Sequence, residues 1–197
     1  MSAADVSTLV LGTRNPHKVR EIERLLAPAG IAVEPLPAGI ELPPETGATF
    51  AENALPKALA AAAATGSPAI ADDSGIESKS LGGAPGVRSA RYAGEGASDE
   101  QNLDKLLREA PEGDRLRYVC ALAYVDPREG VEEMFLGECL GRLSTTPLGE
   151  GGFGYDPAFV PDDGPEGRTM AELTDSAKDA ISHRGRAIRE FLTWLRS

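Results

Sequence analysis

The sequence predicts an α/β fold, because short apolar runs with the length of buried strands alternate with segments of helical periodicity. The run at residues 8–12 is compact and apolar, and apolar side chains then recur at helical spacing over residues 16–26. The same order follows at residues 31–33 and 49–65. A third apolar run, residues 69–71, comes next. Alternating strands and helices are typical of the α/β class.

The composition is that of an ordinary globular protein. The chain has 197 residues, of which 41% are hydrophobic and 26% charged, enough for one substantial domain or two small lobes around a cleft. The net charge of −11 argues against a nucleic-acid polymer or an anionic membrane surface as the main partner. Residues 1–7 lack the pattern of a secretory signal, and the small-residue run 60–64 is too short to span a bilayer. We therefore expect a cytoplasmic protein.

The start of the first predicted helix has the features of an anion site. Asn15 and Pro16 form a strong helix start, with Asn as the N-cap and Pro at the first helical position. A strand that leads into a helix N-terminus presents free N–H groups and the positive end of the helix dipole. Lys18 places a cation in the first turn, where the dipole favours an acid. We interpret Thr13, Asn15 and Lys18 as a triphosphate cradle, the alternative being an ordinary surface lysine.

The second helix is predicted from residue 49 to about residue 65. Thr49 and Glu52 match a capping box, since each side chain can reach the backbone N–H of the other, and Gly66 ends the helix. Pro56 lies inside this segment and removes one backbone hydrogen bond. We therefore expect a bend or a late start.

Two adjacent carboxylates, Asp72 and Asp73, follow the apolar run 69–71 and mark the candidate centre of chemistry. Successive strand residues point to opposite faces, so both can aim at one spot only if the strand stops there. We expect the strand to end at a cleft, with one aspartate for chemistry and the other for support. A hard divalent cation with oxygen ligands would stabilise two neighbouring carboxylates. The alternative is a solvated turn, for which Asp, Ser and Gly are ordinary residues.

The remaining elements follow from capping, periodicity and glycine content. Helices are expected from Ser98, over 174–182 and over 186–195, with two long strands over 116–125 and 131–143. If these strands form a hairpin, Cys120 and Cys139 fall roughly opposite each other. We expect buried thiols there rather than a redox pair.

A glycine-rich loop at residues 145–157 presents the side chains of Phe153, Tyr155 and Asp156. Aromatic residues make up only 5% of the chain, so two of them in one flexible loop are informative.

Six stretches, in order and spanning nearly the entire chain, together resemble the inosine triphosphate pyrophosphatase family. The stretches are 13–18 (TRNPHK), 49–54 (TFAENA), 71–75 (ADDSG), 81–86 (LGGAPG), 152–157 (GFGYDP), and Lys178 with 182–185 (SHRG). The resemblance implies a single domain over 1–197, an elongated two-lobed α/β structure around a long mixed β-sheet flanked by helices, with the active site in the cleft between the lobes. It also implies Mg²⁺-dependent cleavage of ITP, XTP and their deoxy forms to the monophosphate and pyrophosphate, which cleanses the nucleotide pool, by an enzyme that is generally a homodimer.

The resemblance assigns roles that these residue types can fill. Asp73 matches the catalytic proton acceptor and, with Glu45, holds Mg²⁺. The phosphate-side residues are Thr13, Arg14, Asn15, Lys18 and Ser74. The base-side residues are Phe153, Gly154, Tyr155, Asp156, Lys178, His183 and Arg184. Stacking on an aromatic face tolerates any purine, so discrimination must come from hydrogen bonds. A 6-oxo group accepts where the 6-amino group of adenine donates, and such mismatches can be worth about 10⁴–10⁵ in rate.

Two departures and two other functions qualify this interpretation. Arg14 stands where many relatives carry Gly, and Pro56 lies where relatives usually have a helix-compatible residue.

One alternative is a related pyrophosphatase for modified or pyrimidine triphosphates, which Phe153 and the His183–Arg184 pair disfavour. The other is a nucleotide-sensing module without turnover, which Asp73 disfavours because pure binding needs no extra acid near phosphates.

Overall fold

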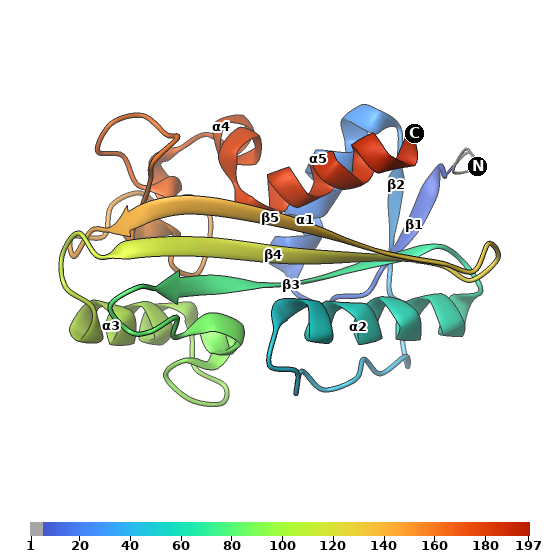
Figure 1. Cartoon of the computed structure of the whole chain (residues 1–197), viewed down its shortest axis with the longest axis horizontal. Helices are drawn as coiled ribbons and strands as arrows, with labels where there is room; N and C mark the ends of the chain where they lie inside the picture. The colour runs from blue at the N-terminus through green and yellow to red at the C-terminus, as the bar shows by residue number, and fades with distance from the viewer. Residues whose placement is uncertain (1–5) are drawn as a thin grey trace. The chain divides into compact units, whose positions relative to one another are not determined.

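The computed structural model describes residues 6–197, which form the α/β fold that the sequence predicts (Figure 1). The strands are β1 (Thr8–Leu11), β2 (Ala32–Pro35), β3 (Ala69–Ser78), β4 (Arg115–Asp126), β5 (Val131–Leu143) and β6 (Phe159–Pro161). The α-helices are α1 (Pro16–Leu26), α2 (Phe50–Thr65), α3 (Asp99–Glu109), α4 (Asp175–Ile181) and α5 (His183–Leu195).

The segment without a secretory pattern, residues 1–7, lies largely outside the described residues. Within the described chain, no helix has the length and apolar character that crossing a membrane requires.

The strands form one open, mixed sheet in the order β2-β1-β3-β4-β5-β6. β1 pairs in parallel with both β2 and β3, whereas β5 and β6 are antiparallel. The short strand β6 has no counterpart in the sequence prediction, because three residues carry too little periodicity to be recognised.

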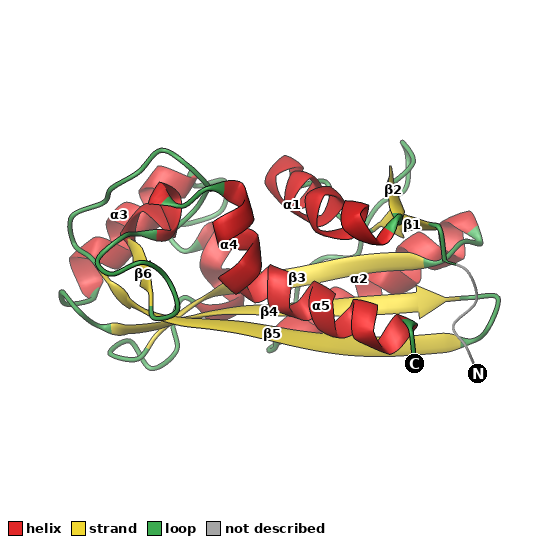
Figure 2. Ribbon diagram, turned by 90° about the horizontal axis from the view of Figure 1, so that it is seen from above, coloured by secondary structure: helices red, strands yellow, loops and turns green. Residues whose placement is uncertain are grey.

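The chain divides into two compact units, each with a hydrophobic core of its own. Unit 1 comprises the chain up to Asp73 together with 120–137 and 184–197, and unit 2 comprises 74–119 and 138–183. In unit 1, α1 and α5 lie on one face of the strands and α2 lies on the other face (Figures 1 and 2).

The two helices of the N-terminal half begin where their capping residues predict. The Asn15 side chain accepts hydrogen bonds at the start of α1, and the reciprocal capping box of Thr49 and Glu52 starts α2. Gly66 ends α2 in the left-handed conformation that glycine adopts at little cost. The helix begins at Phe50 and continues through Pro56, so the expected late start is wrong, and the alternative, a bend, stays a prediction. Pro56 falls within the second turn of α2, at an exposed position.

Strand β3 continues through the two aspartates, and the expectation that it ends there is wrong. It extends over ten residues from Ala69 to Ser78. Gly75 does not turn the chain. Its missing side chain makes room instead, because a Cβ atom at this position would collide with Ser89 Oγ and lie 2.6 Å from the Gly86 carbonyl oxygen. Close packing in unit 2 therefore requires glycine inside the strand.

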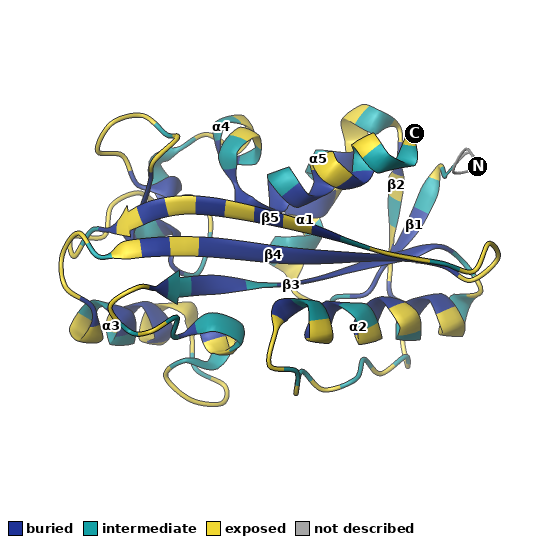
Figure 3. Cartoon of the chain, in the orientation of Figure 1, coloured by how far each residue is buried: buried dark blue, intermediate teal, exposed yellow. Residues whose placement is uncertain are grey.

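The long strands β4 and β5 confirm the predicted pair of strands, and they differ in burial. β4 is buried along most of its length, whereas β5 alternates between buried and exposed residues (Figure 3). Both cysteines are buried thiols that form no disulfide, as predicted, Cys120 in the unit 1 core and Cys139 in the unit 2 core. Burial raises the pKa of Cys120 to about 12, so its thiol stays protonated and unreactive near neutral pH.

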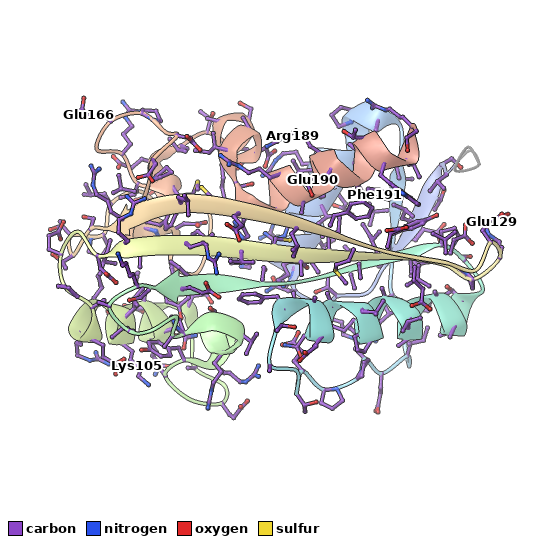
Figure 4. All side chains as sticks on the ribbon, viewed as in Figure 1. Lys105, Glu129, Glu166, Arg189, Glu190 and Phe191 are labelled. Atoms are coloured by element: carbon purple, nitrogen blue, oxygen red, sulfur yellow. The ribbon has the colours of Figure 1, made fainter. Side chains whose placement is uncertain are left out.

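Helix α5 is anchored by an aromatic cluster in the core of unit 1. Phe191 is fully buried, and its ring lies 5.3 Å from Tyr124, 5.5 Å from Phe135 and 6.4 Å from Trp194 between centroids. Figure 4 shows the Phe191 side chain on the side of α5 that faces the strands. The helix begins at His183, three residues earlier than its apolar periodicity predicts.

Phe191→Ala should lower the free energy of unfolding by about 3–5 kcal/mol. Removal of the buried ring leaves a cavity that the surrounding aromatic side chains cannot fill. Urea denaturation followed by circular dichroism measures the change. Thr193→Ala, at an exposed position of the same helix, should stay within about 0.5 kcal/mol of the parent chain. A loss at position 191 no larger than that at 193 would contradict this account of the core.

Candidate active site

The two adjacent aspartates of β3 point to opposite faces of unit 1, as the pleat of a continuous strand requires. The Asp72 carboxylate contacts side chains of α1 and α5, and the Asp73 carboxylate contacts side chains of α2. These helices cover opposite faces in Figure 1. The two carboxylates therefore have different nearest partners, although the charges of Lys18 and Lys57 act on both.

The Asp72 carboxylate is fully buried and paired with two cations. Its Oδ2 atom lies 2.8 Å from Arg184 Nη2 and 3.1 Å from Lys18 Nζ. Burial alone would raise the pKa of Asp72, but the charges of Lys18, Arg184 and Lys57 together hold it well below its usual range. Arg184 also donates to Glu21 of α1. A buried charge network thus connects α1 and the start of α5 to β3.

The Asp73 carboxylate is buried beside α2 and is less strongly compensated. Asn53 Nδ2 donates to Asp73 Oδ2 at 2.9 Å, and Lys57 Nζ lies 3.9 Å from Asp73 Oδ1. Burial raises the pKa of Asp73, the charge of Glu45 raises it further, and Lys57 and Lys18 offset only part of the increase. A carboxylate with a raised pKa is a better proton acceptor near neutral pH.

Glu45 and Asp73 flank the ammonium group of Lys57. Lys57 Nζ lies 2.6 Å from Glu45 Oε1 and donates to the backbone carbonyl of Asp72 at 2.8 Å. The pair of carboxylates therefore already attracts a cation. No group of three or more His, Cys, Asp or Glu suited to a metal ion occurs among residues 6–197. Two carboxylates still fit Mg²⁺, which proteins bind through one or two carboxylates completed by water and substrate phosphates.

Three predicted phosphate-side residues cluster at the start of α1. The Asn15 Oδ1 atom accepts from the backbone N–H of His17 at 2.9 Å and of Lys18 at 3.3 Å. Thr13 Oγ1 accepts from the N–H of Asn15 at 3.2 Å. The Lys18 side chain lies in this turn with its ammonium group on Asp72. The helix start is thus ordered by its own side chains, and a cation stands beside it.

The other two predicted phosphate-side residues are Arg14 and Ser74. Arg14 is exposed and donates to the carbonyl of Ile40 at 2.6 Å. Ser74 follows Asp73 on β3, is partly exposed and belongs to unit 2.

Two of the predicted base-side residues, Phe153 and Lys178, donate hydrogen bonds to the buried carboxylate of Asp156. Its Oδ2 atom accepts from Lys178 Nζ at 2.6 Å and from the Phe153 backbone N–H at 2.9 Å. Its Oδ1 atom accepts from the Tyr118 hydroxyl at 3.1 Å. The Lys178 ammonium group also stands 5.1 Å from the centre of the Phe153 ring, a cation–π distance. The backbone N–H of Gly154 donates to an α3 carboxylate at 2.9 Å, which holds the loop in place.

Tyr155 and His183 are more buried than their predicted roles suggest. Tyr155 belongs to the core of unit 2, and its hydroxyl donates to the Ser89 carbonyl at 2.8 Å, so its contacts assign it to support of the loop. The His183 imidazole stacks on the ring of Tyr118, with centroids 4.6 Å apart and planes at 5°. The Arg184 side chain belongs to unit 1, where it donates to the carboxylates of Asp72 and Glu21.

Comparison with known proteins identifies the family of the chain. A sequence profile of the Ham1 family matches residues 9–194. The chain belongs to the Ham1 family. It is 51% identical to a dITP/XTP pyrophosphatase of Frankia alni, over 95% of this chain and 96% of that protein. The resemblance drawn from the six sequence motifs is thereby confirmed.

Solved structures of Ham1 proteins share the fold. A HAM1 protein from Coxiella burnetii superimposes with a TM-score of 0.84 and 37% identity, covering 95% of this chain and 98% of that one. A nucleoside-triphosphatase / dITP/XTP pyrophosphatase from Mycobacterium abscessus superimposes with a TM-score of 0.72 and 41% identity, covering 94% and 98%.

Four residues of this Ham1 protein join the candidate site without having been predicted from its sequence: Glu21, Asn53, Lys57 and Tyr118. Asn53 and Lys57 did leave a signal. They are polar side chains spaced i, i+4 on the buried face of a helix otherwise rich in alanine, a position that such side chains occupy only with a partner. Tyr118 left none, since a tyrosine in a buried strand usually serves packing.

Lys57→Gln should lower the free energy of unfolding by about 3 kcal/mol in a metal-free buffer, because it leaves buried carboxylate charge uncompensated. Urea denaturation in EDTA measures the loss. Adding Asp73→Asn to this variant should restore part of the stability by removing one of the charges. Lys79→Gln, at an exposed position, is the control. Equal stabilities of the two glutamine variants would refute the electrostatic account of Lys57.

Proposed function

We propose that this Ham1 family protein hydrolyses non-canonical purine nucleoside triphosphates, such as ITP, XTP and their deoxy forms, to the monophosphate and pyrophosphate. The observation that carries the proposal is the buried Asp73 carboxylate, whose pKa is raised and which lies among Asn53, Lys57 and Glu45. The relatives named dITP/XTP pyrophosphatase support the substrate class.

In this proposal Asp73 accepts the proton of the water that attacks the α-phosphorus, while pyrophosphate leaves. The hydrogen bond from Asn53 holds one carboxylate oxygen, which directs the other toward the water. Lys57 keeps Asp73 and Glu45 close together by attracting both. Mg²⁺ held by Asp73 and Glu45 would neutralise charge on the phosphate oxygens. Hydrolysis by this arrangement depends mainly on positioning and electrostatics.

The triphosphate would bind the start of α1. Its backbone N–H groups are oriented by Asn15, and Lys18 adds a positive charge beside them. We assign Thr13 and Ser74 hydroxyl contacts with the phosphates, and Arg14 a peripheral charge. Arg184 would support binding of the triphosphate indirectly. It neutralises the Asp72 carboxylate, which also holds the Lys18 side chain.

The purine would bind the residues of unit 2 around Asp156. Phe153 offers a ring for stacking, and Lys178 and His183 supply donors for a 6-oxo group. Adenine carries a donor at this position and would leave those donors unpaired. Asp156 would accept from a ring N–H, which 6-oxo purines have and adenine lacks.

Incubation with ITP, XTP, dTTP and ATP, with Mg²⁺ or with EDTA, tests the proposed function. We expect pyrophosphate from ITP and XTP at least 100-fold faster than from ATP or dTTP, and no product in EDTA. Orthophosphate as the product would refute the proposed reaction. Preferred cleavage of dTTP would favour the pyrimidine alternative, and tight binding without product would favour a nucleotide sensor.

Asp73→Asn should lower kcat for ITP by about 10²–10⁴-fold, because an amide cannot accept the proton from water. ITP binding, measured by calorimetry, should remain detectable because phosphate and base contacts are kept. Asp104→Asn, at an exposed position of α3, should leave kcat unchanged. Normal turnover by the Asp73 variant would remove this residue from the mechanism.

Two expectations of the sequence, a homodimer and a cytoplasmic location, stay predictions.

A further inference from the structure

Tyr118 contacts two of the residues proposed to recognise the base, although no sequence motif includes it. It lies on β4 with its side chain buried in unit 2. Its hydroxyl donates to Asp156 Oδ1 at 3.1 Å, and its ring stacks on the imidazole of His183 at 4.6 Å and 5°. One side chain therefore contacts a candidate acceptor through its polar end and a candidate donor through its ring.

The ring of Tyr118 is itself held by packing. The Phe159 ring lies 4.6 Å away at an interplanar angle of 52°, a tilted arrangement that fixes the phenol against the core of unit 2. A phenylalanine would fill the same space. The hydroxyl is thus not needed for packing, and its bond to the Asp156 carboxylate is the feature that packing does not explain.

The hydroxyl bond holds one of the two oxygen atoms of the Asp156 carboxylate. With Oδ1 held by Tyr118, Oδ2 faces Lys178 Nζ at 2.6 Å and the Phe153 N–H at 2.9 Å. The Lys178 ammonium group, which lies over the Phe153 ring, is thus bonded to a carboxylate whose other oxygen is held by Tyr118. Loss of the hydroxyl would let the carboxylate rotate and the ammonium group move with it.

We propose that Tyr118 is a positioning residue for purine selection, whose ring orients His183 and whose hydroxyl orients Asp156 and, through it, Lys178. The inference rests on the proposed function, because it assumes that these residues meet the base. Misplaced donors weaken binding of a 6-oxo purine and leave adenine, which gains nothing from those donors, almost unaffected. Tyr118 therefore acts on the preference for ITP over ATP rather than on the chemical step.

Tyr118→Phe, which keeps the ring and removes only the hydroxyl, is the direct test. We expect KM for ITP to rise about 10-fold, in line with the loss of one hydrogen bond to a charged group, with kcat within about twofold of the parent enzyme. The value of kcat/KM for ATP should not change. The ratio of kcat/KM for ITP to kcat/KM for ATP should therefore fall about 10-fold.

Tyr124→Phe is the matched control. Tyr124 is also a buried tyrosine of β4 whose hydroxyl bonds an aspartate, Asp126 at 3.4 Å, but it lies in the core of unit 1. This variant should keep the selectivity of the parent enzyme. An unchanged ratio in Tyr118→Phe would overturn the inference. An equal fall in kcat/KM for both nucleotides, together with a lower Tm, would assign Tyr118 a purely structural part and overturn it as well.

The ring contact has a readout that needs no nucleotide. The chain contains only two histidines, so their imidazole proton signals can be assigned in an NMR spectrum. Those of His183 should be shifted upfield by the Tyr118 ring, should stay so in Tyr118→Phe, and should return toward those of His17 in Tyr118→Leu. Unshifted His183 signals in the parent protein would overturn the stacking. Failure of the parent enzyme to release pyrophosphate from ITP would instead refute the proposed function.

Discussion

The structure of unit 1 depends on the neutralisation of two adjacent carboxylates inside a sheet. Asp72 and Asp73 lie in a central strand, where isolated charges would be strongly unfavourable. Each of three helices supplies one cation: Lys18 from α1, Lys57 from α2 and Arg184 from α5. The ion pairs that hold the helices against the strand are therefore the same contacts that form the candidate site.

The two carboxylates differ because their cations are unequally distributed. Asp72 has two cations close to its Oδ2 atom and a lowered pKa. Asp73 accepts a hydrogen bond from the Asn53 amide, lies farther from the Lys57 ammonium group and has a raised pKa. Pairs of titratable groups whose environments separate their pKa values in this way are typical of acid–base sites. A carboxylate that stays charged suits support of the helices, and one that is readily protonated suits acceptance of a proton.

Much of the fold and some of the site could be predicted from the sequence, because the decisive interactions are local. The starts of α1 and α2 follow from Asn15 and Thr49, whose side chains bond N–H groups two or three residues away. The strands β4 and β5 follow from long apolar or alternating runs. The motif around Asp72 and Asp73 could be recognised by its residue types, and with the other motifs it identified the Ham1 family.

The sequence by itself thus determined the α/β class, the helix starts and the family, whereas the tertiary structure decided which side chains meet. Continuation of β3 past Asp73 depends on pairing with neighbouring strands, so local residue types suggested a turn instead. The contact of Arg184 with Asp72 joins residues 112 positions apart, and that of Tyr118 with Asp156 joins residues 38 apart. Such contacts depend on how the strands and helices pack, which no local pattern of residues encodes.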